Sequence, residues 1–172
     1  MSNRPVNSSR LMKLRVMVDM ERSAGILLLA CLLVLPAFAA GDPFSGTWKL
    51  NVAKSKLQSP APESDTVRIE IEGNDLRIQQ EGVDDKGEPF KLTVQGGFDD
   101  SRYGMTGFRY ADAISFRRAG SRRIAAEVRK AGVVVAWLDA EVSGNTLKVN
   151  LSVLDSDGKE VKSLAILQRD NP

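Results

Sequence analysis

The chain has 172 residues, of which 24 are Lys or Arg, 22 are Asp or Glu, one is Cys and none is His. A chain of this length holds one domain, with or without a processed segment. Because it has no His, the sequence excludes a Ser-His-Asp triad, a Cys-His pair, a His-ligated zinc site and a His pH switch.

The first forty residues carry the parts of a secretory signal peptide. Basic residues precede an uncharged apolar run at residues 24–41, which ends in Ala37-Phe38-Ala39. A basic segment, an apolar segment and an A-x-A site define such a peptide. We therefore predict cleavage after Ala39, so that residues 1–39 are the signal peptide and residues 40–172 form the exported domain, periplasmic or secreted.

Alternatives remain open for this segment. A start at Met17 or Met20 would remove the first 16–19 residues and leave a compact signal peptide. An uncleaved anchor is a second alternative, although the run is just short of the ~20 residues that span a membrane. A lipoprotein is the third, because residues 28–31 resemble a lipobox, but Cys31 is followed by further apolar residues instead of a polar tether.

The exported domain is nearly neutral, with 19 basic and 20 acidic side chains, and has no Cys. A neutral domain has no overall field that attracts nucleic acid. Without Cys it forms no disulfide and has no thiol nucleophile. We expect no metal and no cofactor.

After residue 46 the domain reads as strands joined by short turns. Apolar and polar residues alternate in short segments, the period of strands with one buried face, and turns rich in Gly, Asn and Asp separate them. Residues 51–63 hold two prolines and read as a loop, and residues 98–113 are less regular. The predicted strands cover residues 46–50, 67–71, 76–79, 90–95, 114–117, 124–128, 133–142, 147–153 and 161–169.

No segment shows a helical period, so the apolar faces of these strands must cover each other. Sequential hairpins favour a barrel over a sandwich, and a closed barrel has no open edges. We predict an all-β fold, a single antiparallel up-and-down barrel of eight or nine strands. The residues expected to face inward are Leu50, Val67, Ile69, Ile71, Leu76, Ile78, Phe90, Leu92, Val94, Ile114, Phe116, Ile124, Ala126, Val128, Leu147, Val149, Leu151, Ser163 and Ala165.

The start of the domain, Phe44-Ser45-Gly46-Thr47-Trp48-Lys49-Leu50-Asn51, followed by Lys54-Ser55-Lys56, resembles that of small exported bacterial lipocalin-like proteins. Residues 103–107 are similar to their mid-chain Y-x-x-T-G. The resemblance implies a calycin-type barrel in which the Trp of G-x-W packs across the closed end.

In such barrels a cation from the last strand lies over this Trp. Gly46 and Trp48 occupy the motif, and Arg169 is the candidate cation. Strand alternation supports this choice independently, because Arg169 shares a face with Leu167. The alternative is an ordinary core Trp at the start of a strand.

An apolar interior predicts either a site for a small hydrophobic or amphipathic molecule or a packed core without a cavity. Four residues in the irregular stretch, from Tyr103 to Tyr110, are expected to form the rim of the barrel mouth or, alternatively, to pack on the core. The candidate ligand-binding residues are Leu92, Tyr103, Met105, Phe108, Tyr110, Phe116 and Ala126.

Two further segments are candidate contact surfaces. Arg117, Arg118, Arg122 and Arg123 flank one predicted turn and form a candidate anion site for an acidic lipid headgroup of the envelope or a carboxylate. The alternative is a solvated hairpin. Residues 133–138 are apolar on both faces, so one face must pack on a second copy of the chain or under the loop at residues 51–63.

The predicted function is that of an exported, non-catalytic barrel that binds or carries a small apolar molecule. The alternative is a structural or protein-interaction barrel of the cell envelope with no such ligand. An enzyme would have to rely on carboxylate, Tyr, Lys or Arg chemistry, and no phosphate-binding or nucleophile-elbow motif is present. Asp155-Ser156-Asp157-Gly158 lacks the closing Glu of a calcium loop and is predicted to be a hairpin turn.

Overall fold

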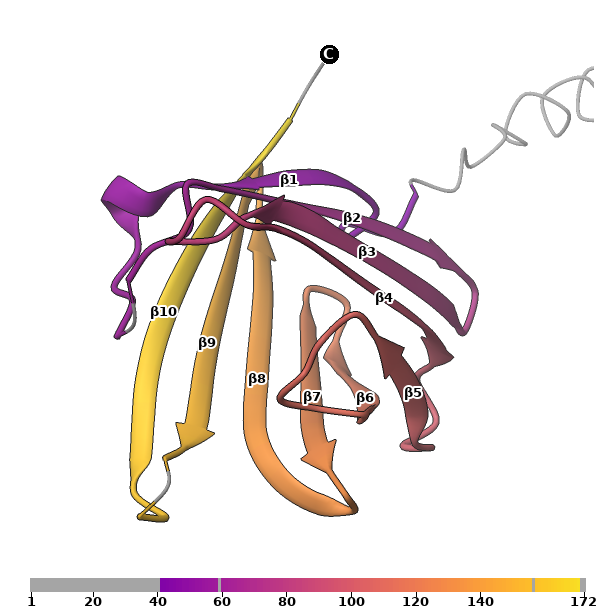
Figure 1. The fold of residues 1–172 in the computed structure, drawn as a ribbon. Helices are drawn as coiled ribbons and strands as arrows, with labels where there is room; N and C mark the ends of the chain where they lie inside the picture. Colours follow the sequence, from indigo (N-terminus) through magenta and orange to yellow (C-terminus); the bar gives the residue numbers. More distant parts are fainter. Residues whose placement is uncertain (1–40, 59, 156, 171–172) are drawn as a thin grey trace, which may run out of the picture. The chain divides into compact units, whose positions relative to one another are not determined.

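The computed structural model describes residues 41–58, 60–155 and 157–170 (Figure 1). The predicted signal peptide, with Cys31 and the cleavage site, lies outside the described residues. Within the described part of the chain, no helix has the length and apolar character needed to cross a membrane.

Ten antiparallel strands close into one barrel, because each strand pairs with the next and β1 pairs with β10. The prediction of an up-and-down barrel is confirmed. The strands are β1 (Gly46–Leu50), β2 (Ser64–Glu72), β3 (Asp75–Val83), β4 (Pro89–Gly97), β5 (Tyr103–Thr106), β6 (Ala113–Gly120), β7 (Arg123–Lys130), β8 (Val133–Ser143), β9 (Thr146–Leu154) and β10 (Glu160–Arg169).

The predicted strand number was wrong, because β5 lies in the stretch that the sequence analysis treats as irregular. This strand has four residues. It pairs with β4 only at Thr93–Thr106 and Val94–Met105, and with β6 at two positions. So short a strand contributes too few alternating positions to produce a period-2 signal.

Strands β1–β4 run across the top of Figure 1, and β7–β10 run crosswise beneath them. The connections after β1, β3, β5, β7 and β9 meet at one end of the barrel, here called the open end. The opposite end, called the closed end, holds the β2–β3, β4–β5, β6–β7 and β8–β9 turns and the last residue of β10.

The barrel interior follows from the register. Ile69 on β2 is opposite Ile78 on β3, which is opposite Val94 on β4, so one row of apolar side chains faces inward. The neighbouring positions are charged or polar and face outward. Most of the predicted inward-facing residues belong to the hydrophobic core or pack against it; Phe90 and Ser163 do not.

The connection from β1 to β2 begins with the short 3₁₀ helix η2 (Val52–Lys54), which the Asn51 side chain caps by accepting a hydrogen bond from the Lys54 N–H. Lys56 then forms an isolated antiparallel bridge with Leu164 of β10. The Gln58 N–H donates to Ser163 Oγ at 3.2 Å. Residues 51–58 therefore extend the wall of the barrel beside β10.

Candidate functional site

The closed end is built around Trp48, whose side chain is completely buried. The Arg169 guanidinium lies 4.1 Å from the centre of the Trp48 ring, and the two residues are register partners on β1 and β10. Trp48 Nε1 donates to the Phe44 carbonyl at 2.8 Å. The contact expected between Trp48 and Arg169 is thus present, with a cation over an aromatic face.

Gly46 allows this arrangement for two reasons. Its φ is +138°, a region that side chains rarely adopt, and a Cβ at this position would lie 2.3 Å from Arg169 Nη1. The close approach lets Arg169 donate to the carbonyls of Ser45 and Pro43 at 2.6 and 2.7 Å. Arg169 therefore holds the chain leading into β1 against the closed end.

A second arginine, which the sequence analysis assigned to an exposed turn, also holds this segment. Arg118 faces the closed end, forms an ion pair with Asp42, and lies 4.4 Å from the centre of the Phe98 ring and 5.6 Å from that of Phe44. Phe44 is buried. Asp42, Phe44 and Phe98 were not recognised as parts of the closed end, because no local pattern links them to Arg118.

The predicted anion site of four guanidinium groups is not assembled. Arg118 is turned to the closed end, and Arg123 donates to both carboxylate oxygens of Asp139 on β8. Arg117 and Arg122 are exposed. Neighbouring residues of a strand point to opposite faces, so Arg117 and Arg118 cannot serve one site together.

On β9 and β10 the inward-facing side chains become more exposed toward the open end, whereas Ile114, Val128 and Ala136, at the open ends of β6, β7 and β8, are buried. On β9, Leu147 is buried, Val149 and Leu151 are partly buried, and Val153 is 36% exposed. The same gradient runs along β10 from Leu167 to partly buried positions. Because these side chains point into the barrel, solvent reaches the interior from the open end.

This half-open interior is the candidate ligand site. Its wall is formed by strands β1–β4 and β8–β10 and is mainly aliphatic. The partly buried apolar side chains that face it are Leu50, Val67, Ile78, Phe90, Leu92, Leu138, Ala140, Val149, Leu151, Val161 and Ala165.

One polar pair interrupts this apolar wall. Asp65 on β2 and Gln80 on β3 both face inward, and Gln80 Nε2 donates to the two carboxylate oxygens of Asp65 at 3.0 and 2.9 Å. Burial raises the pKa of the Asp65 carboxyl from its ordinary value, and the hydrogen bond from Gln80 opposes this rise. The sequence analysis missed Asp65, since it placed the start of β2 at residue 67.

The predicted ligand-binding residues are divided among four places. Phe116 and Ala126 are buried in the core, while Leu92 and Met105 are partly buried and pack against it. Burial in the core removes Phe116 and Ala126 from the wall that solvent reaches.

The aromatic residues do not form one rim, contrary to the prediction. The Tyr103 ring lies over Gly96, where a Cβ would be 2.5 Å from its Cδ2. Its hydroxyl donates to Asp99 Oδ1 at 2.8 Å in the β4–β5 turn, which raises the pKa of Tyr103 and lowers that of Asp99. Phe108 and Tyr110 lie at the opposite end, exposed and packed edge to face with their ring centres 5.7 Å apart.

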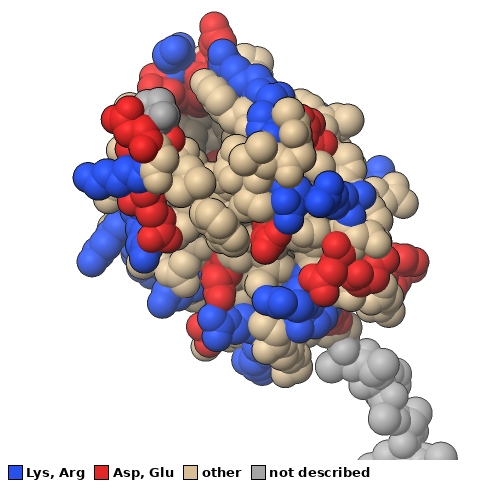
Figure 2. Space-filling model, turned by 90° about the horizontal axis from the view of Figure 1, so that it is seen from below, with Lys and Arg blue, Asp and Glu red and all other residues tan. Residues whose placement is uncertain are grey.

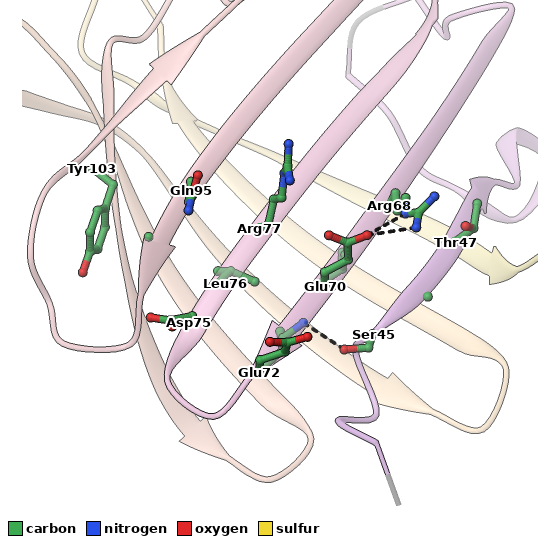
Figure 3. A pocket seen from close by; sticks show the side chains of 14 residues that line it. Ser45, Thr47, Arg68, Glu70, Glu72, Asp75, Leu76, Arg77, Gln95 and Tyr103 are labelled. Atoms are coloured by element: carbon green, nitrogen blue, oxygen red, sulfur yellow. Dashed lines mark hydrogen bonds and ion pairs between the residues drawn. The ribbon is translucent and has the colours of Figure 1, made fainter.

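A separate groove of about 1010 Å³ lies on the outer face of β1–β4 (Figure 3). Arg68 pairs with Glu70 at 2.9 Å, and Glu70 is opposite Arg77 in the register. The groove carries charges of both signs that are largely exposed, so its ion pair contributes little stability. Among the described residues, no cluster of three or more acidic, His or Cys side chains is suited to hold a metal ion.

Two hairpin turns, one of them the turn predicted to begin at Asp155, are closed by their own side chains. Asp155 Oδ1 accepts from the Asp157 and Lys159 N–H groups, and Asp84 Oδ1 accepts from those of Lys86 and Glu88. These backbone hydrogen bonds lower the pKa of Asp84. Both carboxylates thus serve the turn geometry.

No protein-family model matches the chain, and no curated protein sequence matches it significantly. Among solved structures, the barrel is similar to the zebrafish ileal bile acid-binding protein in complex with cholic acid. The TM-score is 0.53 at 12% sequence identity, and the match covers 74% of this chain and 99% of the other. At this identity the similarity concerns the fold alone: the chain forms a closed antiparallel up-and-down β-barrel similar to that of the bile acid-binding protein.

Proposed function

We propose that the protein is an exported, non-catalytic barrel that binds a small hydrophobic or amphipathic molecule in the open half of its interior. The observation that carries this proposal is the gradient of exposure along the inward faces of β9 and β10. Some of the apolar side chains that face inward remain accessible to solvent. When an apolar ligand covers them, the binding free energy becomes more favourable by about 25 cal/mol for each Å² of apolar surface removed from water. The bile acid-binding neighbour, which has the same type of barrel, supports this proposal.

The composition of the open end is a second support. Large apolar side chains are rarely exposed in groups without a reason. Figure 2 is seen from below, with the β7–β8 and β9–β10 turns toward the viewer, and uncharged residues occupy its centre with charged side chains around them. Five of the six exposed large apolar side chains of the described residues lie at this end: Val52, Phe108, Tyr110, Val133 and Val153.

Export is proposed from the sequence of residues 1–39, and the lack of a catalytic role from the absence of His. Native mass spectrometry of the protein purified from the periplasm of an expressing cell tests the main proposal. We expect a mass that starts at Ala40, with an adduct of a few hundred daltons. A protein with no adduct, which also fails to bind the neutral dye N-phenyl-1-naphthylamine, would contradict the ligand-binding function. A lipidated mass starting at Cys31 would instead overturn the predicted processing.

The second candidate function is that of an interaction barrel that pairs with another copy through β8. The observation that favours it is Trp137, a large side chain on the outer face of this strand that is 39% exposed. Residues 51–58 lie beside β10, so they do not supply the cover expected for this strand. Sedimentation velocity of the wild type and of Trp137→Ser decides: a wild-type dimer that the substitution dissociates supports this function, and a wild-type monomer excludes it.

A further inference from the structure

On strands β1–β4 and β8–β10, the inner face toward the open end carries a single charged side chain. Along strands β1–β4 and β8–β10, all of whose residues the structure describes, the inward-facing positions hold two ionisable groups. Arg169 lies at the closed end, over Trp48. Asp65 is therefore the one charged group that these seven strands present on the inner face toward the open end.

Apolar side chains surround the Asp65–Gln80 pair. Gln80 is opposite Val67 on β2 and Leu92 on β4, so these side chains form one row on the inner face. Asp65 is opposite Gly82, whose other neighbour is Phe90. The Phe90 ring lies over Gly82, since a Cβ there would be 2.9 Å from Phe90 Cζ. A carboxylate and an aromatic ring thus flank a position that has no side chain.

The carboxylate retains unused hydrogen-bonding capacity. Gln80 Nε2 contributes one nitrogen to its two oxygens, whereas a carboxylate offers about four lone-pair sites. Among the described residues, no Lys or Arg nitrogen lies within ion-pair distance of Asp65. A partly buried carboxylate without a cation favours a ligand that brings one.

We propose that Asp65 is the polar anchor of the ligand site and that it selects a cationic amphiphile, a protonated amine joined to an apolar body. The amine donates to the Asp65 oxygens beside the face of Phe90, and the apolar body covers the aliphatic wall. A carboxylate ligand of the same size is disfavoured, because two negative charges would meet in a site of low polarity. This inference rests on the proposed function, since it specifies the ligand class of the same site.

The test compares three probes with one apolar chain: dodecylammonium, dodecanol and dodecanoate, each kept monomeric at pH 7. Their dissociation constants are measured by displacement of the neutral dye N-phenyl-1-naphthylamine. We expect dodecylammonium to bind about tenfold more tightly than dodecanol, the effect of one charge-assisted hydrogen bond, and dodecanoate to bind least tightly.

Two substitutions and one control assign this preference to Asp65. Asp65→Asn is expected to reduce dodecylammonium affinity to that of dodecanol, about tenfold, while dodecanol affinity is unchanged. Asp65→Lys is expected to reverse the order, so that dodecanoate binds best. Asp75→Asn is the matched control, because Asp75 is an exposed carboxylate on the outer face of β3; it should change no affinity.

The outcomes separate this inference from the function on which it rests. If the dye and dodecanol bind but the amine has no advantage, or if Asp65→Asn leaves the amine affinity unchanged, the anchor role is wrong and the ligand-binding function stands. If neither the dye nor any probe binds, both are wrong.

Discussion

The Arg169 guanidinium covers the face of the Trp48 ring at 4.1 Å and donates to the Ser45 and Pro43 carbonyls, joining the last strand to the chain that leads into the first. This arrangement closes one end of the barrel. The cation–π contact and the two charged hydrogen bonds are partly shielded from solvent, so each contributes more to stability than it would at an exposed position.

We expect Arg169→Ala to lower the free energy of unfolding by about 2–3 kcal/mol, from the loss of the cation–π contact and two charged hydrogen bonds. Arg169→Lys should lose less unfolding free energy than Arg169→Ala but should still be less stable than the wild type, since an ammonium lacks the planar fork that reaches both carbonyls. Urea denaturation measures both. Lys49→Ala is the control: its exposed ion pair with Asp170 should contribute less than about 1 kcal/mol.

Gly46→Ala should destabilise the barrel by about 1–3 kcal/mol, because the new Cβ meets Arg169 and the backbone has a positive φ. Gly104→Ala on β5 is the matched control. A Cβ at Gly104 has nothing within 4 Å, so its melting temperature should stay near that of the wild type. Equal losses in the two variants would contradict the role assigned to Gly46.

Asp65→Asn should make stability depend less on pH. Burial raises the pKa of Asp65 in the folded protein, so the folded state holds its proton more tightly than the unfolded state. The cost of ionising Asp65 is therefore absent below the ordinary value of 3.8, grows as pH rises through the interval up to the raised pKa, and is complete above it.

The substitution should accordingly increase the free energy of unfolding at pH 7 and leave it unchanged near pH 3, relative to the wild type. Urea titrations across this range measure the difference. Asp75→Asn should stay within about 0.5 kcal/mol of the wild type throughout, as expected for an exposed surface position. An Asp65→Asn variant that loses stability at pH 7 would contradict the assigned effect of burial.

Ala165→Trp should fill part of the open interior. Ala165 faces inward on β10 opposite Val149, and both are partly buried. We expect the affinity for N-phenyl-1-naphthylamine to fall about tenfold or more, with the fold retained by circular dichroism. Lys162→Trp, on the exposed outer face of β10, introduces the same side chain outside the barrel and should leave dye binding unchanged.

The sequence predicted the strands whose alternation is long and regular. Strand β9 alternates from Leu147 to Val153, and its pattern alone indicates which side chains face inward. Strand β5 was not predicted, because its four residues include Gly104 and lie between irregular segments. Asp65 was not predicted to face inward either, because it is a polar residue at the start of β2 and so does not extend the apolar alternation of that strand. Its inward direction follows from the register of β2 with β3.

The sequence by itself determined the all-β class and the closed up-and-down order, because these depend on a period of two. The contact of Trp48 with Arg169 was predicted from a family resemblance, with the alternation of the last strand as support. Only the tertiary structure decided that Arg118 leaves the predicted anion site for Asp42 and Phe98, and that the inward-facing side chains of β9 and β10 are buried at the closed end and partly exposed toward the open end. These outcomes depend on how residues far apart in the chain fill a shared volume, and a strand's alternation gives the face of a side chain but not the neighbours that it meets there.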